Sequence, residues 1–365
     1  MIQYIITGLT IIFIIFFYLL LCNCKNEENF SNSLPDLNNP VFVPLYTNKG
    51  TKLNILLVSK PFGGDNDYKL YLNNINKYTY IGITSYMEFP FLPSNKIDNY
   101  KIDNDSANNT GSAYNLEMYF KMCEGWLHCF RDPIKYLPMD KPLALISESD
   151  FVDYHKAKPD PKVKKEYDFL YSCPKVNDKS TCDDWVSHNK NWDLAYKCLP
   201  ILCLKFKLKG LLIGRKNCKL PEGCEEYITT TGWLDYGENI KQYNKCKFIF
   251  VPNQRDASPR VLTEALSYNL PCLVNKNILG GWKYVDKMTG EFFTDENDIS
   301  SSLTVLLDNL NKYKPRQYMI DNYGPINSGV RLKNYLFDNF KDKLNIKENE
   351  CEYITIRHQF NNYKK

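Results

Sequence analysis

The stretch FVPNQRDASPRVLTEALSYNLP, residues 250–271, decides the fold class of this chain. It begins as the end of an apolar strand, passes through a short polar loop and continues as an amphipathic helix. Ser258 is a favoured residue type at a helix N-cap and Pro259 at the first helical position, so a helix is expected over 259–268. A strand that runs directly into a helix is the building unit of a parallel α/β sheet.

The same alternation continues on both sides of this stretch and indicates a complete α/β domain. Apolar runs predict strands at 167–171, 211–214, 248–251 and 272–274, and helical spacing of apolar residues predicts helices at 192–204 and 299–310. Strands that alternate with helices imply a parallel sheet. We therefore expect a nucleotide-binding domain over 166–330, followed by a C-terminal helix and tail over 331–365.

A second, smaller α/β domain is expected over 51–165. The run LNILLVS at 53–59 is followed by two glycines, which is typical of a buried parallel strand that ends in a loop. A further strand is predicted at 143–146, and apolar residues at helical spacing predict a helix over 114–130.

Three polar residues of this smaller domain allow two interpretations each. His128 lies inside the expected helix, where a packed position is favoured over a role as a base. Glu148 and Asp150 follow a predicted strand, so they could contact an acceptor, although capping of their own loop is favoured.

The N-terminal segment predicts a membrane anchor. Residues 2–22 carry no charge, and a helix needs roughly 20 such residues to cross a bilayer. A basic n-region and a small-residue cleavage site are both missing, so an uncleaved single-pass anchor over 1–24 is favoured over a signal peptide. The charges on either side of this segment show almost no Lys/Arg asymmetry, so they barely indicate its orientation in the membrane. We favour a lumenal catalytic part. Residues 25–50, rich in Asn, Ser, Pro and Glu, are expected to form a stalk.

The cysteines and the glycosylation sequons are informative about the cellular compartment of the chain. Thirteen cysteines suit an oxidising lumen, although many of them could be small buried hydrophobes instead. The close pairs that could form disulfides are Cys123/Cys129, Cys173/Cys182 and Cys218/Cys224. Asn29, Asn104 and Asn108 each open a glycosylation sequon. The four histidines are not in zinc-ligand spacing, so no metal site is expected.

Charge and residue usage say little about partners. The formal net charge of +4 arises from 46 basic and 42 acidic residues spread along the chain, so no basic stripe points to nucleic acid. The free use of Asn, Lys, Ile and Tyr suggests an AT-biased coding sequence, as in some protists and large DNA viruses.

Five elements between about 166 and 325 resemble the retaining glycosyltransferases of family 4, the group 1 glycosyl transferases. Asp256 and Glu264 have that family's acidic residue, seven intervening positions and a Glu. The other elements are the pair Gly280-Gly281, the strand TGEFF at 289–293, the turn TGWL at 231–234 and the strand FIFVP at 248–252. The resemblance implies a GT-B fold, in which two Rossmann-like domains face a cleft.

The resemblance also implies roles for these residues. Glu264 would hold the ribose of a nucleoside diphosphate sugar, Asp256 would contact the transferred sugar, and Gly280 and Gly281 would let the chain approach the nucleotide closely. No metal would be required, and retention would be the usual course.

The helix start at Ser258 and Pro259 offers a diphosphate its free N–H groups and positive dipole end. The family's usual Arg is missing after the strand that ends at Tyr171. Lys190-Asn191-Trp192 resembles the family's Lys-Gly or Lys-Asn at the start of the next helix, which makes Lys190 the first candidate for a catalytic cation. Arg215, at the end of the second strand, is the second candidate.

The leading hypothesis is therefore transfer of a sugar to an unidentified glycan, protein or lipid acceptor. The alternative is a non-catalytic, membrane-anchored protein with a degenerate GT-B fold. A dinucleotide enzyme is disfavoured, because no Gly-x-Gly-x-x-Gly follows the strand at 53–59.

Overall fold

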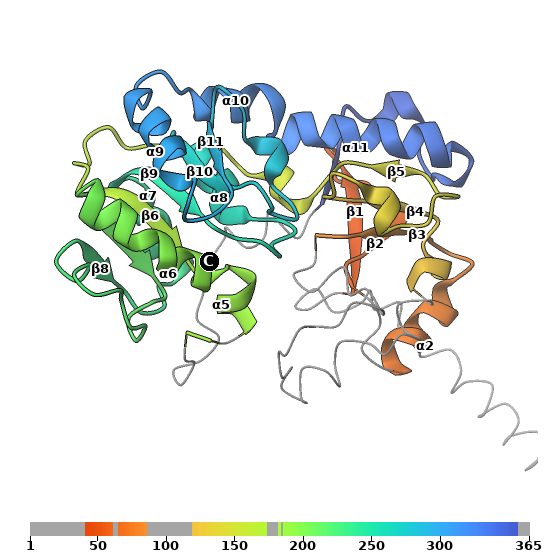
Figure 1. Cartoon of the computed structure of the whole chain (residues 1–365). Coiled ribbons are helices and arrows are strands. Elements are labelled where there is room, and N and C mark those ends of the chain that lie inside the picture. The colour runs from red at the N-terminus through yellow and green to blue at the C-terminus, as the bar shows by residue number, and fades with distance from the viewer. Residues whose placement is uncertain (1–40, 61–64, 86–118, 174–181, 184, 357–365) are drawn as a thin grey trace, which may run out of the picture. The chain divides into compact units, whose positions relative to one another are not determined.

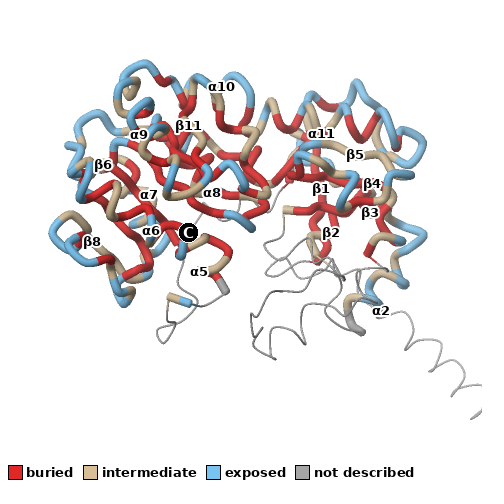
Figure 2. Tube along the Cα trace, viewed as in Figure 1, coloured by how far each residue is buried: buried red, intermediate tan, exposed pale blue. Residues whose placement is uncertain are grey.

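Two six-stranded sheets organise the chain. The structure is a computed structural model that describes residues 41–60, 65–85, 119–173, 182–183 and 185–356 (Figure 1). The strands of both sheets are mostly buried, as the tube in Figure 2 shows. The described residues all belong to one compact unit that begins at Val41.

The first sheet has the strand order β12-β1-β2-β3-β4-β5. The pairs from β2 to β5 are parallel, whereas β1 pairs antiparallel with both β2 and β12. The strands are β1 Phe42–Thr47, β2 Lys52–Val58, β3 Thr79–Ile83, β4 Gly125–Leu127, β5 Leu143–Ala144 and β12 Ile354–Ile356. The strands predicted at 53–59 and 143–146 are thus confirmed, the second in a shorter form.

The expected stalk is wrong at its C-terminal end, because 42–47 is a buried strand. Val43 and Leu45 pack into one side of the sheet, and Phe42 packs into the other. Pro44 is unfavourable within a strand, because proline has no N–H that can donate a hydrogen bond to a neighbouring strand. The structure accommodates it where the register between β1 and β2 shifts.

The helix predicted over 114–130 is confirmed at 119–122 but wrong beyond them, because Gly125–Leu127 forms β4 beside β3. Residues 114–118 lie outside the described residues. Trp126 and Leu127 are both fully buried and belong to core clusters on opposite faces of the sheet. A short, continuous apolar run cannot be assigned to helix or strand by periodicity alone. His128 therefore follows a strand rather than lying in a helix.

The second sheet is entirely parallel and has the order β11-β10-β9-β6-β7-β8. Its strands are β6 Tyr167–Ser172, β7 Gly210–Ile213, β8 Ile228–Thr230, β9 Cys246–Val251, β10 Cys272–Asn275 and β11 Gly290–Phe293. Every strand predicted between 166 and 330 is present, and β8 was not predicted. The parallel order confirms the expected α/β architecture.

Helices connect the strands and cover the sheets. The α-helices are α2 Asp65–Asn74, α5 Trp185–Asn189, α6 Trp192–Pro200, α7 Tyr236–Tyr243, α8 Arg260–Ser267, α9 Ile299–Asp308, α10 Pro315–Asn322 and α11 Gly324–Phe340. Shorter turns are η1 Pro133–Lys135, η2 Glu148–Phe151, η4 Trp282–Tyr284, η5 Lys341–Lys343 and η6 Glu348–Glu350, and the π-helix η3 Ile201–Lys205 continues α6. Buried pairs at 194/195, 198/199 and 202/203 give α6 and η3 one continuous core face.

The C-terminal segment returns to the first sheet. Leu332 and Leu336 of α11 are fully buried in the same core cluster as Leu45 of β1, and β12 forms the edge of that sheet (Figure 1). The helix expected in the tail is present, but it begins at Gly324 and ends at Phe340. The region 331–356 therefore completes the first sheet instead of forming a separate tail.

The predicted anchor and the three sequons lie outside the described residues. Within the described ranges, no helix is long and apolar enough to cross a membrane.

The predicted cysteine pairs are wrong. The disulfide joins Cys182 to Cys218, which the sequence had assigned to two different pairs. Among the described residues, nine free cysteines are all buried, including Cys123, Cys129, Cys173 and Cys224. Proximity in sequence failed as a guide, because a helix and two strands bring distant loops together.

Candidate functional site

The order of the second sheet defines where a ligand can bind. From β6 the chain passes to β7 and β8 on one side, and then crosses to β9, β10 and β11 on the other side of β6. β6 and β9 are neighbouring strands, and the loops that follow them lead to opposite sides of the sheet. Open parallel sheets bind ligands at the carboxyl ends of their strands at such a switch point.

Two predicted site residues meet at this point. Lys190, which lies beyond β6, forms a buried ion pair with Oδ2 of Asp256, which lies beyond β9. Asn253 donates a hydrogen bond from Nδ2 to the same oxygen over 2.7 Å. The side chains of Lys190 and Asp256 are only 11% and 8% exposed. The loops after β6 and β9 thus place one cation and one anion together.

Hydrogen bonds hold these two loops in register. The side-chain amide of Asn191 donates to the carbonyl of Pro252 over 3.2 Å, and the N–H of Gln254 donates to the carbonyl of Asn189 over 3.4 Å. Asn191 has a φ of 53°, a left-handed conformation that Asn tolerates better than most residues. Lys190 is therefore flanked on both sides by residues fixed to the β9 loop.

The start of α8 differs from the sequence prediction. The helix begins at Arg260, and Pro259 occupies the N-cap without a side-chain hydrogen bond. Ser258 does not cap the helix, because its Oγ accepts from the N–H of Ser149 and bonds to the hydroxyl of Ser149 at 2.7 Å. The residue patterns favour Ser258 as a cap, but a residue 109 positions away binds its hydroxyl.

The two glycines pack against the same loop. A Cβ at Gly280 would lie 1.8 Å from the carbonyl oxygen of Ala257, and one at Gly281 would lie 2.4 Å from Cγ of Pro259. Gly281 also has a φ of 83°, which L side chains rarely adopt. The N–H of Gly280 donates to the carbonyl of Asp256 over 2.9 Å. The two glycines therefore pack closely against the loop that carries Asp256, and neither position has room for a side chain.

Glu264 lies buried within α8, and Oε2 accepts a hydrogen bond from the hydroxyl of Tyr243 over 2.9 Å. Burial raises the pKa of Glu264, while hydrogen bonds from Tyr243 and Tyr236 and the charge of Arg260 oppose that rise. Two tyrosine hydroxyls thus orient the carboxylate. This arrangement fixes an acceptor group about one turn from the start of the helix.

Arg215 lies beyond β7 and is 2% exposed. Its guanidinium donates to Oγ of Ser187 over 2.6 Å, contacts Sγ of Cys173 and lies 5.6 Å from the ring centre of Trp192. Ser187 belongs to α5, the short helix that ends next to Lys190. Arg215 therefore packs against the element that carries the other candidate cation.

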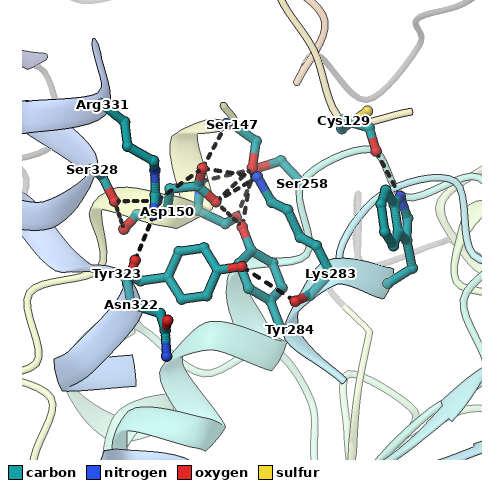
Figure 3. Close-up of polar contacts among 12 residues, drawn as sticks. Cys129, Ser147, Asp150, Ser258, Lys283, Tyr284, Asn322, Tyr323, Ser328 and Arg331 are labelled. Carbon is teal, nitrogen blue, oxygen red and sulfur yellow. Dashed lines mark hydrogen bonds and ion pairs between the residues drawn. The ribbon is translucent and has the colours of Figure 1, made fainter. Parts of the chain in front are cut away.

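A buried network surrounds Asp150 near Ser258 (Figure 3). Asp150 is fully buried and accepts from the N–H of Ser147 over 3.1 Å, which confirms its capping role. Lys283 forms an ion pair with it at 2.8 Å, the hydroxyl of Tyr284 donates to it, and Arg331 lies 3.8 Å away. Burial and the neighbouring carboxylate raise the pKa of Tyr284. The network joins η2, η4 and α11.

His128 is buried after β4, and burial together with the charge of Lys283 lowers its pKa from 6.5 to about 4. Among the described residues, its Nδ1 has no hydrogen-bond partner. The side chain is therefore neutral near pH 7.

Comparison with known proteins identifies the architecture. No family model and no curated protein matches the chain. TarM shares 13% identity at a TM-score of 0.52, over 77% of this chain and 54% of TarM. Sucrose-phosphate synthase from Thermosynechococcus elongatus shares 10% identity at a TM-score of 0.51, over 73% of this chain and 69% of the synthase. This chain has the GT-B fold. It spans about half the length of TarM, and the likeness concerns the fold alone.

The sequence analysis did not identify three residues that lie at or near the candidate site. They are Asn253, which binds Asp256, Ser149, which binds Ser258, and Lys283, which binds Asp150. No motif marks these positions. Only the folded chain shows that their partners lie close by.

Proposed function

We propose that the chain is a glycosyltransferase that binds a nucleoside diphosphate sugar at the carboxyl end of the second sheet. The observation that carries this proposal is the meeting of Lys190 and Asp256 at the switch point between β6 and β9. TarM and sucrose-phosphate synthase, two of the solved proteins that share the fold, are glycosyltransferases, which supports the same class of reaction.

The proposed chemistry depends on the leaving diphosphate. Negative charge grows on the diphosphate as the bond to the sugar breaks, so cations and N–H groups fixed nearby stabilise the transition state. The start of α8 supplies N–H groups and the positive end of a helix dipole. Lys190 and Arg215 are the proposed cations, with Lys190 first because it lies at the switch point.

The two acidic residues have separate proposed roles. The Glu264 carboxylate, oriented by Tyr243 and Tyr236, retains lone pairs that can accept from two vicinal hydroxyls such as those of ribose. Asp256 and the adjacent backbone would contact the transferred sugar. Gly280 and Gly281, by supporting that loop, would keep Asp256 in place. No metal is assigned to the proposed reaction.

Several finer features belong to the same proposal. Transfer proceeds with retention, the acceptor is a glycan, protein or lipid, and residues 1–24 anchor the chain in a membrane with the catalytic part on the lumenal side. The family-4 resemblance motivates retention, and the uncharged run at 2–22 motivates the anchor.

A second candidate function has an observation of its own. Lys190 is already paired with Asp256, and Arg215 is held by Ser187 and Cys173. Cations that are committed to protein partners suit a structural role. A non-catalytic protein with a degenerate GT-B fold would keep these contacts and bind no donor.

A binding and turnover panel separates the two candidates. The full chain is titrated with UDP, GDP and ADP, and hydrolysis of the corresponding nucleotide sugars is measured. We expect one nucleotide to bind, and Glu264→Gln to weaken it by about 1–3 kcal/mol, the scale of a hydrogen bond to a charged group. Glu238→Gln, on the exposed part of α7, is the control and should leave affinity unchanged.

Unchanged affinity in a folded Glu264→Gln variant would remove Glu264 from the ribose. Absence of binding and hydrolysis across all three nucleotide classes would favour the non-catalytic candidate.

A further inference from the structure

Asp150 joins three parts of the chain that are far apart in sequence. It lies in η2, where the chain crosses from the first sheet to the second. Its carboxylate accepts hydrogen bonds from Lys283 and Tyr284 of η4, which lies between β10 and β11 of the second sheet. Its main-chain carbonyl accepts from the hydroxyl of Ser328 over 2.7 Å, and Ser328 lies on α11, where the chain returns to the first sheet (Figure 3). Both crossings and the loop after β10 therefore meet at one residue.

A first set of contacts connects Asp150 to the start of α8. The carboxylate accepts from the N–H and from the hydroxyl of Ser147 over 3.1 and 3.2 Å, so it keeps the turn of η2 closed. Ser149 lies within that turn, and its hydroxyl and N–H bind the hydroxyl of Ser258 at 2.7 and 3.1 Å. Ser258 directly precedes Pro259, the N-cap of α8. The turn that Asp150 closes therefore binds the loop before α8.

A second set of contacts reaches the same loop through a glycine. Tyr284, whose hydroxyl donates to Asp150, also donates its N–H to the carbonyl of Gly281 over 3.0 Å. A Cβ at Gly281 would lie 2.4 Å from Cγ of Pro259, so the backbone of Gly281 packs directly on the N-cap of α8. Two independent sets of contacts thus connect Asp150 to the start of this helix.

The charges of this network favour a positioning role over a purely stabilising one. The side chain of Asp150 is 0% exposed and that of Lys283 is 6% exposed. Taking two charges out of water costs about as much free energy as their attraction returns, so a buried ion pair is weak evidence for stability. Charged hydrogen bonds are nevertheless directional, and they admit few alternative arrangements of the groups that make them. Such a pair is suited to hold the neighbouring loop in one conformation.

We propose that Asp150 is a positioning residue for the start of α8. The catalytic consequence rests on the proposed function, in which the N–H groups at this helix start bind the diphosphate of the donor. These groups stabilise the transition state only while they point at the charge that develops there. A displacement of about 1 Å can cost on the order of 10²-fold in rate. A residue outside the second sheet therefore controls the geometry of a site that the second sheet carries.

Hydrogen–deuterium exchange tests the positioning role without a donor. In the full chain, exchange of the peptide that covers 256–262 is followed by mass spectrometry. Tyr284→Phe removes the hydroxyl that binds Asp150 and should make this peptide exchange about 2–10-fold faster, the effect of one lost hydrogen bond on local opening. Ser149→Ala, in the first set of contacts, should act in the same direction. Tyr335→Phe is the matched control, because its buried hydroxyl binds a main-chain carbonyl next to β5 instead.

Turnover of nucleotide sugars supplies the second measurement. Asp150→Asn removes the charge that pairs with Lys283 and should lower kcat by at least about tenfold. KM should change less, because the helix start acts mainly on the transition state. Tyr284→Phe should lower kcat by a smaller factor, and Tyr335→Phe should leave it unchanged. If Asp150→Asn fails to fold, Tyr284→Phe decides the question.

The outcomes separate this inference from the proposed function. Faster exchange at 256–262 in the variants, without turnover of any nucleotide sugar by the wild-type chain, would support the positioning role and overturn the proposed function. Turnover by the wild-type chain, together with unchanged exchange and unchanged kcat in Tyr284→Phe and Ser149→Ala, would overturn the inference alone. Equal changes in Tyr284→Phe and Tyr335→Phe would also overturn it, because they would show a general loss of stability.

Discussion

Replacement of Lys190 by Met separates a catalytic cation from a structural one. Met keeps most of the length of the side chain and removes the charge. Asp256 would then lie buried with Asn253, which donates to it over 2.7 Å, as its remaining side-chain donor among the described residues. Breaking a buried ion pair costs about 3–5 kcal/mol, and the retained Asn253 favours the lower end, about 3 kcal/mol.

The effect on turnover should exceed what lower stability explains. Removing a donor aimed at developing charge costs about 10²–10³ in kcat. We expect Lys190→Met to lower kcat by at least about tenfold, with a smaller change in donor affinity, the pattern of an interaction that strengthens in the transition state.

The assay combines initial rates at saturating donor with urea unfolding of the same samples. Lys190→Arg retains the charge and should recover part of the lost turnover. Lys247→Met is the control, because Lys247 is a half-exposed cation at the opposite end of β9. Wild-type kcat in a folded Lys190→Met protein would refute the reasoning, and Arg215→Ala would then test the second cation.

Two further predictions concern pH and the membrane. The pKa of His128 is about 4 in the folded protein and 6.5 ordinarily, so the unfolded chain binds more protons between these values and stability falls as pH drops. Between pH 7.5 and 5.0 urea unfolding should show a loss of about 2 kcal/mol that His128→Gln lacks, and an equal loss in both proteins would contradict the assignment. The full chain should stay in the membrane pellet through alkaline carbonate washing, whereas deletion of 1–24 should release it. Release of the full chain would mean that 2–22 does not span the bilayer.

The parallel sheet could be read from the sequence because its strands are buried on both faces. The runs at β6, β7, β9 and β10 are nearly continuous in apolar residues, and helices with clear apolar periodicity follow them. The proximity of Lys190 and Asp256 could also be inferred from the sequence, because the two residues follow neighbouring parallel strands.

The failures have physical causes that the local sequence does not contain. β1 holds a proline, and its burial depends on α11 and β12, which lie about 300 residues away. The hydroxyl of Ser258 suits an N-cap, yet Ser149 binds it. The pairing of Cys182 with Cys218 depends on two loops, after β6 and after β7, that the sheet brings together. In each case a distant segment decided the outcome.

The pairing of β12 with β1 makes the order of synthesis matter. The first sheet begins at residue 42 and is completed only by residues 324–356, whereas the second sheet uses the continuous stretch 167–293. As the chain leaves the ribosome, the second sheet is complete while the first still lacks an edge strand and its covering helix. Domains usually fold in the order in which they emerge, but here the downstream half is expected to fold first. The upstream half must keep its exposed apolar strands from aggregating until residues 324–356 have been synthesised.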